Sequence, residues 1–271
     1  MTTFTLATKG RLRYLEALPP PAARSRGTLV LIHAFPLSAH MWEPQLALSA
    51  GGWRVIAPFL RGFAGGADDP GTQSMNDFAA DVVDLLDALH VTEAVICGLS
   101  LGGYVSMALL RLAPHYFKGL VLADTRKDAD TPEGLAARTK MLALVREQGP
   151  AAVADQMIPK LLSPRSVSER PELVAQVRSL VMSNDTRAIE GAISAMMTRE
   201  DSTEPLSTVR FPTLVVVGEN DSLTPPPMAE ALKNAVAGAH LVVIPEAGHL
   251  ANLEQPRGFN DAVGDFLERR V

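Results

Sequence analysis

Val95-Ile96-Cys97-Gly98-Leu99-Ser100-Leu101-Gly102-Gly103 is an apolar, β-favouring run that ends in the pattern Gly-x-Ser-x-Gly. Apolar residues recur at helical spacing from Tyr104 to Leu112, so this stretch predicts a strand, a tight turn and a helix. A serine on such a turn is held exposed, and the flanking glycines leave room for the cramped backbone. The pattern alone arises by chance in roughly one chain in ten of this length, so other residues must decide its meaning.

Strand and helix patterns alternate on both sides of this turn. A helix is expected through residues 41–48, capped by Ser38 or a neighbour, and another begins at Ser74. The first two strands form an antiparallel hairpin around Lys9-Gly10, and the alternation predicts an α/β fold with a mostly parallel, eight-stranded sheet flanked by helices. The expected strands are residues 4–7, 12–16, 28–32, 53–57, 95–99, 120–123, 213–217 and 240–244.

The alternation stops between residues 128 and 208. This segment contains only helical patterns, interrupted by prolines, and alternation resumes with the strand at 213–217, a helix at 229–236 and a last helix that ends near Arg270. We therefore expect a core domain of residues 1–127 and 209–271, with a helical cap inserted as residues 128–208. The expected cap helices are residues 132–148, 151–162, 172–183 and 186–198.

The composition is that of a globular protein rather than one that binds nucleic acid or spans a membrane. The 271 residues are 47% hydrophobic and 20% charged, and the net charge of −5 gives no reason to expect nucleic acid or an anionic membrane as partner. One cysteine, Cys97, precludes an internal disulfide and fits a reducing compartment. The N-terminal residues lack the pattern of a signal peptide, so we expect a cytoplasmic location. The sequence does not decide whether the protein forms a homo-oligomer.

Chemically useful residues follow four of the expected strands. Ligands bind at the carboxyl ends of parallel strands, which is where Ser100, Asp221 and His249 lie, in the chain order that accompanies Gly-x-Ser-x-Gly. A serine hydroxyl is a poor nucleophile until a histidine takes its proton, and an acid orients that histidine. Asp221 is the favoured acid, with Asp124 at another strand end and Glu219 as alternatives.

The same strand ends supply candidates for charge stabilisation. Developing oxyanion charge needs fixed donors, and the backbone N–H groups of Leu101, at the helix start, and of Phe35, after His33, are well placed to provide them. His33 is expected to shape this loop through hydrogen bonds rather than act as base. The histidines show no metal-ligand spacing, and no phosphate-binding glycine loop follows the first parallel strand, so we expect no metal and no cofactor.

Substrate contacts are expected from the cap and from the strand ends. Arg126 would meet a substrate carboxylate, although an ion pair at the surface or between the domains explains it as well. The cap residues lie at helical spacing, so packing of the cap onto the core explains most of them equally well. The candidate substrate-binding residues are His33, Trp42, Arg126, Met141, Ile158 and Met196.

Several motifs together resemble the α/β-hydrolase superfamily, over nearly the whole chain. The chain is most similar to small bacterial carboxylesterases and 3-oxoadipate enol-lactonase-like enzymes with a four-helix cap. It departs from the family pattern at Ala34 and Ala64, where glycine is usual or frequent. The motifs are His33-Ala34-Phe35-Pro36-Leu37 with Trp42, Leu60-Arg61-Gly62-Phe63, Gly98 to Gly103, Gly218-Glu219-Asn220-Asp221 with Thr224-Pro225-Pro226, and Gly248-His249 with Leu253-Glu254-Gln255-Pro256.

The resemblance implies a serine-dependent carboxylesterase. Ser100, Asp221 and His249 would form the triad, Phe35 and Leu101 the oxyanion hole, and small to medium acyl esters would react through an acyl-enzyme without a cofactor. A lactonase of the enol-lactonase type and a perhydrolase with cofactor-free haloperoxidase activity are alternatives. A non-catalytic ligand-binding protein on a hydrolase scaffold is a remote one. The expected partner is therefore a small-molecule ester or lactone.

Overall fold

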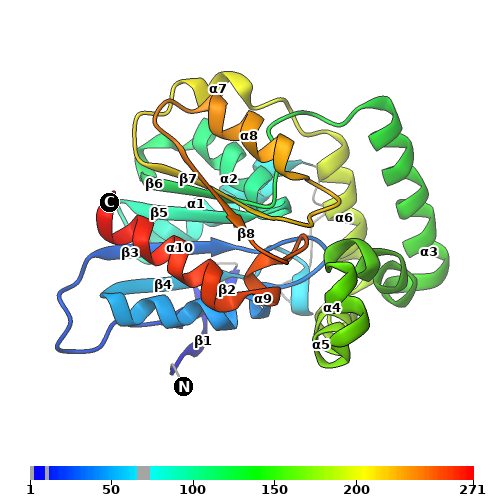
Figure 1. Cartoon of the computed structure of the whole chain (residues 1–271), viewed down its shortest axis with the longest axis horizontal. Helices are drawn as coiled ribbons and strands as arrows, with labels where there is room; N and C mark the ends of the chain where they lie inside the picture. Colours follow the sequence, from blue (N-terminus) through cyan, green and yellow to red (C-terminus); the bar gives the residue numbers. More distant parts are fainter. Residues whose placement is uncertain (1–2, 10–11, 66–73) are drawn as a thin grey trace.

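The residues that the computed structural model describes, 3–9, 12–65 and 74–271, contain one eight-stranded sheet (Figure 1). Its order is β1-β2-β4-β3-β5-β6-β7-β8; β2 pairs antiparallel with β1 and β4, and the remaining neighbours are parallel. Gly10 of the expected hairpin turn lies outside the described residues. The strands are β1 Thr5–Lys9, β2 Leu12–Ala17, β3 Gly27–Ile32, β4 Trp53–Pro58, β5 Ala94–Leu99, β6 Phe117–Ala123, β7 Thr213–Gly218 and β8 His240–Ile244.

Helices cover both faces of this sheet because its central strands are apolar on both sides. All six residues of β5 are buried, and successive side chains enter two different apolar clusters, Ile96 in one and Cys97 in the other. Helices α1, α2 and α8 contribute to the first cluster, and η1 and α10 to the second. The helices outside the segment between β6 and β7 are η1 Ala39–Gly51, η2 Phe63–Gly65, α1 Met75–Ala88, α2 Leu101–Leu112, η3 Pro114–Tyr116, α8 Pro226–Ala235, α9 Ala251–Glu254 and α10 Pro256–Arg269.

Two helix starts test the expected capping. Ser74 precedes α1, as the sequence predicts, and its backbone N–H donates to Asp77 Oδ2 at 2.9 Å, which was not predicted. Ser38 precedes η1 but its side chain makes no capping hydrogen bond, so that part of the prediction is wrong. The expected helix is also a 3₁₀ helix that contains Pro44, whose missing N–H removes one internal hydrogen bond.

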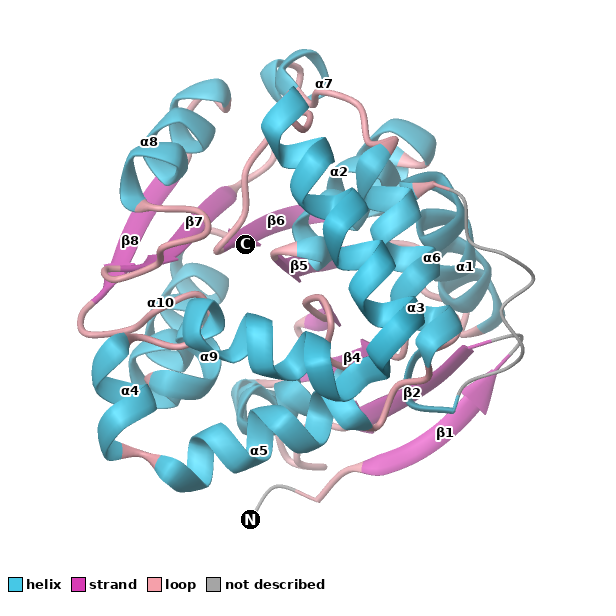
Figure 2. Cartoon of the chain, turned by 90° about the vertical axis from the view of Figure 1, so that its right-hand side faces the viewer, coloured by secondary structure: helices cyan, strands magenta, loops and turns pink. Residues whose placement is uncertain are grey.

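Between β6 and β7 the chain forms helices α3 to α7, of which α3 to α6 gather at one end of the sheet (Figures 1 and 2). The two expected helices 132–148 and 151–162 form the single element α3, interrupted at Gly149, where φ is 72°. The helices α4 and α7 were not expected. Among the described residues, no helix is long and apolar enough to cross a membrane. These helices are α3 Pro132–Leu161, α4 Pro164–Glu169, α5 Pro171–Met182, α6 Thr186–Met197 and α7 Thr203–Ser207.

Candidate active site

Ser100 occupies the turn between β5 and α2 in a strained backbone conformation. Its φ of 55° and ψ of −111° are rare for a residue with a side chain, and its N–H is held by the carbonyl of Ala123 at 2.9 Å. The neighbouring glycines are required by close approach. A Cβ on Gly98 would lie 2.2 Å from the carbonyl oxygen of Gly102, and a Cβ on Gly102 would lie 2.0 Å from that of Ile32. The turn therefore presents the serine as the sequence pattern predicts.

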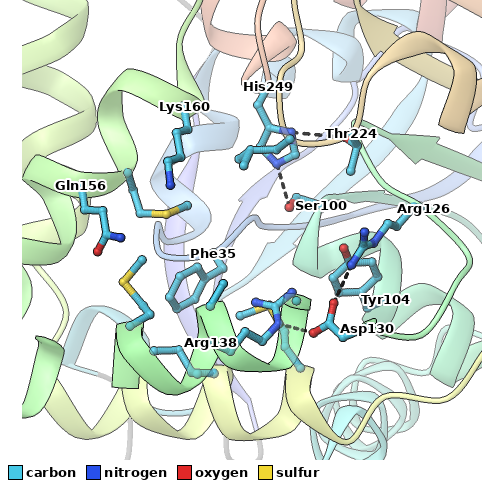
Figure 3. Close-up of a pocket in the computed structure, with 17 residues that line it drawn as sticks. Phe35, Ser100, Tyr104, Arg126, Asp130, Arg138, Gln156, Lys160, Thr224 and His249 are labelled. Atoms are coloured by element: carbon cyan, nitrogen blue, oxygen red, sulfur yellow. Dashed lines mark hydrogen bonds and ion pairs between the residues drawn. The ribbon is translucent and has the colours of Figure 1, made fainter. Parts of the chain in front are cut away.

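His249 lies between the serine and a carboxylate. Its Nε2 is 2.8 Å from Ser100 Oγ, and its Nδ1 is 2.8 Å from Asp221 Oδ2 (Figure 3 shows the serine contact). An ionised carboxylate only accepts hydrogen bonds, so Nδ1 carries the proton and Nε2 is free to accept the serine hydroxyl. The imidazole is therefore oriented to remove the hydroxyl proton of Ser100.

The carboxylate of Asp221 is held by its own loop. Its Oδ1 accepts the backbone N–H groups of Leu223 and Thr224, at 2.8 and 3.0 Å, and Oδ2 accepts the hydroxyl of Thr224 at 2.6 Å. Burial opposes ionisation, but the attraction of His249 and these hydrogen bonds outweigh it and lower the pKa of Asp221 to about 2. Sequence reasoning gave Thr224 no role, although an aspartate side chain that bonds the backbone two residues on, as Asp221 bonds Leu223, is a common turn motif.

The two alternative acids are held elsewhere. Asp124 Oδ1 accepts the backbone N–H of Gly218 at 2.8 Å, and burial followed by repulsion from Asp221 raises its pKa. Glu219 Oε2 accepts the backbone N–H of Glu246 at 2.9 Å in an exposed position. Of the three acids considered from the sequence, the structure brings Asp221 to the histidine.

The candidate oxyanion donors lie beside the serine. Leu101 is the first residue of α2, so its N–H has no acceptor within the helix. Phe35 follows β3 and lines the same cavity as Ser100. These positions permit two N–H groups to face a carbonyl oxygen bound at Ser100, and their role remains a proposal.

His33 is a buried support for the loop after β3. Its Nε2 accepts the backbone N–H of Leu60 at 3.1 Å, and its Nδ1 lies 3.1 Å from the carbonyl oxygen of Ala34. Burial lowers the pKa of this histidine to about 4, so the ring is neutral near pH 7. It contacts the edge of Phe63 and does not line the cavity at Ser100.

A cavity of about 280 Å³ opens at Ser100 and His249 (Figure 3). Three of the residues expected to bind substrate line it: Arg126, Met141 and Met196. Its wall also contains residues that the sequence did not single out, among them Tyr104, Asp130, Arg138, Gln156 and Lys160.

Three of the expected substrate contacts, His33, Trp42 and Ile158, do not line the cavity. Trp42 is fully buried and packs against the ring of Phe259, with ring centroids 5.9 Å apart. Ile158 is also buried and belongs to the apolar cluster on the η1 side of the sheet. Both residues have the helical spacing of a packing face, and packing is what they do. Within the described ranges, no group of three or more His, Cys, Asp or Glu residues is arranged to hold a metal ion.

Arg126 lines the cavity and also makes an ion pair. Its Nη2 bonds Oδ1 of Asp130, whose other oxygen bonds Arg138. Arg199 Nη1 lies 2.8 Å from Oδ1 of the same carboxylate. The ion pair considered from the sequence is therefore present, and it brings Arg126 into a larger cluster.

Comparison with known proteins agrees with this architecture. A family model described as the alpha/beta hydrolase family matches residues 29–262. A 3-oxoadipate enol-lactonase from Acinetobacter baylyi is 27% identical over 244 residues, which cover 90% of each protein. Among solved structures, a thermophilic esterase from Thermogutta terrifontis with malate bound has a TM-score of 0.89 and 32% identity, over 98% of both chains. Because the family model spans most of its length, this chain belongs to the alpha/beta hydrolase family.

Proposed function

We propose that this protein is a serine-dependent carboxylic ester hydrolase. The observation that carries the proposal is the continuous chain of hydrogen bonds from Ser100 through His249 to Asp221, with both contacts of the imidazole at 2.8 Å. The strained turn that presents Ser100 to the cavity supports the same conclusion. So does the similarity of the chain to a thermophilic esterase at 32% identity over 98% of its length.

The geometry supports acyl transfer in two steps. Ser100 Oγ attacks the ester carbonyl while its proton moves to His249 Nε2, and the alcohol leaves with that proton. Water then attacks the carbonyl of the acyl-enzyme while His249 takes its proton. The acid is released as His249 returns that proton to Ser100. Asp221 keeps the imidazole in the required tautomer and stabilises the imidazolium. The N–H groups of Leu101 and Phe35 would bind the oxyanion, and loss of one such donor costs about 10²–10³ in rate.

Residues 128–208 would act as the cap of this site. Met141 and Gln156 from α3 and Ile193 and Met196 from α6 line the cavity, so these helices limit what reaches Ser100. The volume of about 280 Å³ suits a small to medium ester. The esterase from Thermogutta terrifontis has malate bound, and malate is a small acid, as would be the acid that hydrolysis of a small ester releases.

A lactonase is the second candidate. A cyclic ester offers Ser100 the same carbonyl group, so the residues and steps are unchanged. The observation that favours it is the enol-lactonase relative, which matches 90% of this chain.

Covalent labelling and substrate comparison test both candidates. A fluorophosphonate probe should label the protein, and the label should disappear in the Ser100→Ala variant; labelling that persists would refute the nucleophile. p-Nitrophenyl esters of increasing acyl length, assayed beside several lactones, should show open esters turned over faster. Lactones reacting far faster would favour the second candidate, and no reaction with either class would refute ester hydrolysis.

A further inference from the structure

One buried carboxylate in the cavity wall forms ion pairs with three arginines from separate parts of the chain. The side chain of Asp130 is 2% exposed and pairs with Arg126 after β6, Arg138 on α3 and Arg199 after α6. Burial disfavours the charged form of Asp130, but the arginines outweigh it and lower its pKa, so the carboxylate is ionised at neutral pH. Asp130 therefore fixes the guanidinium groups in place at the cavity.

The cavity wall is left with excess positive charge. Three cations, Arg126, Arg138 and Lys160, line it together with one carboxylate, Asp130, so two positive charges are uncompensated among the described residues of the wall. Arg199 does not line the cavity and pairs with the same Asp130 carboxylate, so it adds to the excess of positive charge. Lys160 is exposed, but Arg126 and Arg138 are partly buried, and an anion stabilises cations that are partly removed from water. A cavity of this kind therefore favours an anionic ligand.

The arginines keep donors for such a ligand. Arg126 bonds Asp130 through Nη2 and Arg138 through Nε, so in each guanidinium at least one nitrogen is not committed to the carboxylate. Both side chains are 21% exposed, which leaves them accessible from the cavity. A guanidinium held in a fixed orientation matches the two oxygens of a carboxylate better than a mobile lysine does.

The arginines and the nucleophile lie on different parts of one wall. Figure 3 shows Arg126 and Arg138 directed toward Asp130 on one side of Ser100, and Lys160 on the other side. Met141, Ile193 and Met196 supply apolar surface in the same cavity. A short apolar chain with an ester at one end and a carboxylate at the other fits this distribution.

From this arrangement we propose that the site is specific for esters that carry a free carboxylate, such as half-esters of short dicarboxylic acids, and that Arg126 and Arg138 bind that carboxylate. The proposal rests on the ester hydrolase function proposed above. If the arginine cluster only tied α3 and the segment after α6 to the core, hydrolysis would show no preference for a charged substrate.

Matched substrates test the proposal. We would compare kcat/KM for monomethyl glutarate, dimethyl glutarate and methyl pentanoate, following acid release by titration. The half-ester should be hydrolysed at least about tenfold more efficiently than the diester, and this advantage should shrink as ionic strength rises. In the Arg138→Gln variant the ratio of half-ester to diester should fall by about tenfold or more. The control is Arg146→Gln, which removes an exposed arginine of the same helix that pairs with Glu190.

The outcomes separate this proposal from the proposed function. Hydrolysis of the diester without preference for the half-ester would overturn the carboxylate subsite and leave the ester hydrolase standing. If no ester is hydrolysed, binding still decides: calorimetry with the Ser100→Ala protein should show the half-ester binding more tightly than the diester. The advantage should be lost in the Ser100→Ala, Arg138→Gln double variant. Equal binding of the two esters would overturn the subsite.

Discussion

Asp124 Oδ1 accepts the backbone N–H of Gly218 at 2.8 Å, which ties the carboxyl group at the end of β6 to the end of β7. Its other oxygen has no hydrogen-bond partner within the described chain, and its raised pKa means that the group is protonated over a wider range of pH than an exposed aspartate. The two buried acids thus differ: Asp221 is ionised and bonded to the imidazole, whereas burial and the repulsion from Asp221 raise the pKa of Asp124. Only the ionised one can stabilise an imidazolium.

Replacing each acid by its amide should separate these roles. Asp221→Asn should lower kcat by several orders of magnitude, about 10⁴ in a comparable triad, because an amide no longer stabilises the required tautomer and the imidazolium. Asp124→Asn resembles the protonated acid and should change kcat by less than about tenfold. Initial rates with a p-nitrophenyl ester measure both. An equal loss in the two variants would contradict the assignment of the acid.

The sequence was sufficient for features encoded by neighbouring residues. The strands follow from short apolar runs, and the turn at Ser100 follows from glycines whose missing side chains admit Gly102 and Ile32. Ser100, Asp221 and His249 each follow a strand in the sequence. Parallel strands bring their carboxyl ends to one edge of the sheet, so these residues were expected to meet there.

The sequence was insufficient where distant segments meet. Arg199 lies far along the chain from Asp130, and nothing in the spacing of either residue indicates their contact. Trp42 and Ile158 could not be distinguished from cavity residues, because a helical apolar face looks the same whether it packs or binds. The role of Glu254 is similar, since its partners are backbone groups of two separate loops.

Glu254 should support both stability and the position of the histidine. Its carboxylate is buried and accepts the backbone N–H of Gly248, the residue before His249, at 2.6 Å, and that of Ser163 at 2.9 Å. In Glu254→Gln the amide nitrogen would face one of these donors, which should lower the free energy of unfolding by about 1–3 kcal/mol. We expect kcat to fall as well, because the loop that carries His249 is less constrained.

Urea denaturation and steady-state kinetics on the same protein preparation would measure these two effects. The control is Glu246→Gln, an exposed glutamate paired with Arg165, for which a change within about 0.5 kcal/mol is expected. If the two variants lose equal stability, the buried hydrogen bonds of Glu254 contribute no more than a surface ion pair.

His33 should make stability depend on pH in the mildly acidic range. Its pKa is about 4 in the folded protein, below the value of about 6.5 expected when unfolded, so the unfolded chain binds the proton more readily between these values. The contribution of His33 to stability is complete above about pH 6.5 and is lost as the pH falls toward 4, by an amount on the order of 3 kcal/mol.

Asp124 changes stability in the opposite direction over part of this range, so the comparison must be between variants. Urea melts of the wild type and of His33→Gln at several pH values should give a smaller slope of stability against pH for the variant. His240→Gln, which removes an exposed histidine, should keep the slope of the wild type. An unchanged slope in His33→Gln would show that the ring does not remain neutral.

Ala64 should gain stability when it is replaced by glycine. Its φ of 53° and ψ of 42° place it in the left-handed region, where a Cβ costs about 1–2 kcal/mol, and the family pattern often has glycine here. The backbone is held in this conformation because the N–H of Ala64 donates to Asn184 Oδ1 at 2.8 Å and its carbonyl accepts Arg13 Nη1 at 2.8 Å. Glycine adds freedom to the unfolded chain, which offsets about 0.4–1 kcal/mol of the gain.

The net effect of Ala64→Gly should be an increase of about 0.5–1 kcal/mol in the free energy of unfolding, and a rise of about 2 °C in Tm. Calorimetry on the wild type and the variant measures it. The same substitution within a helix, Ala80→Gly in α1, should lower stability by about 1 kcal/mol, because there φ is negative and glycine only adds unfolded-state entropy. A loss of stability in both variants would mean that the strain at Ala64 is smaller than the entropy that its side chain removes from the unfolded chain.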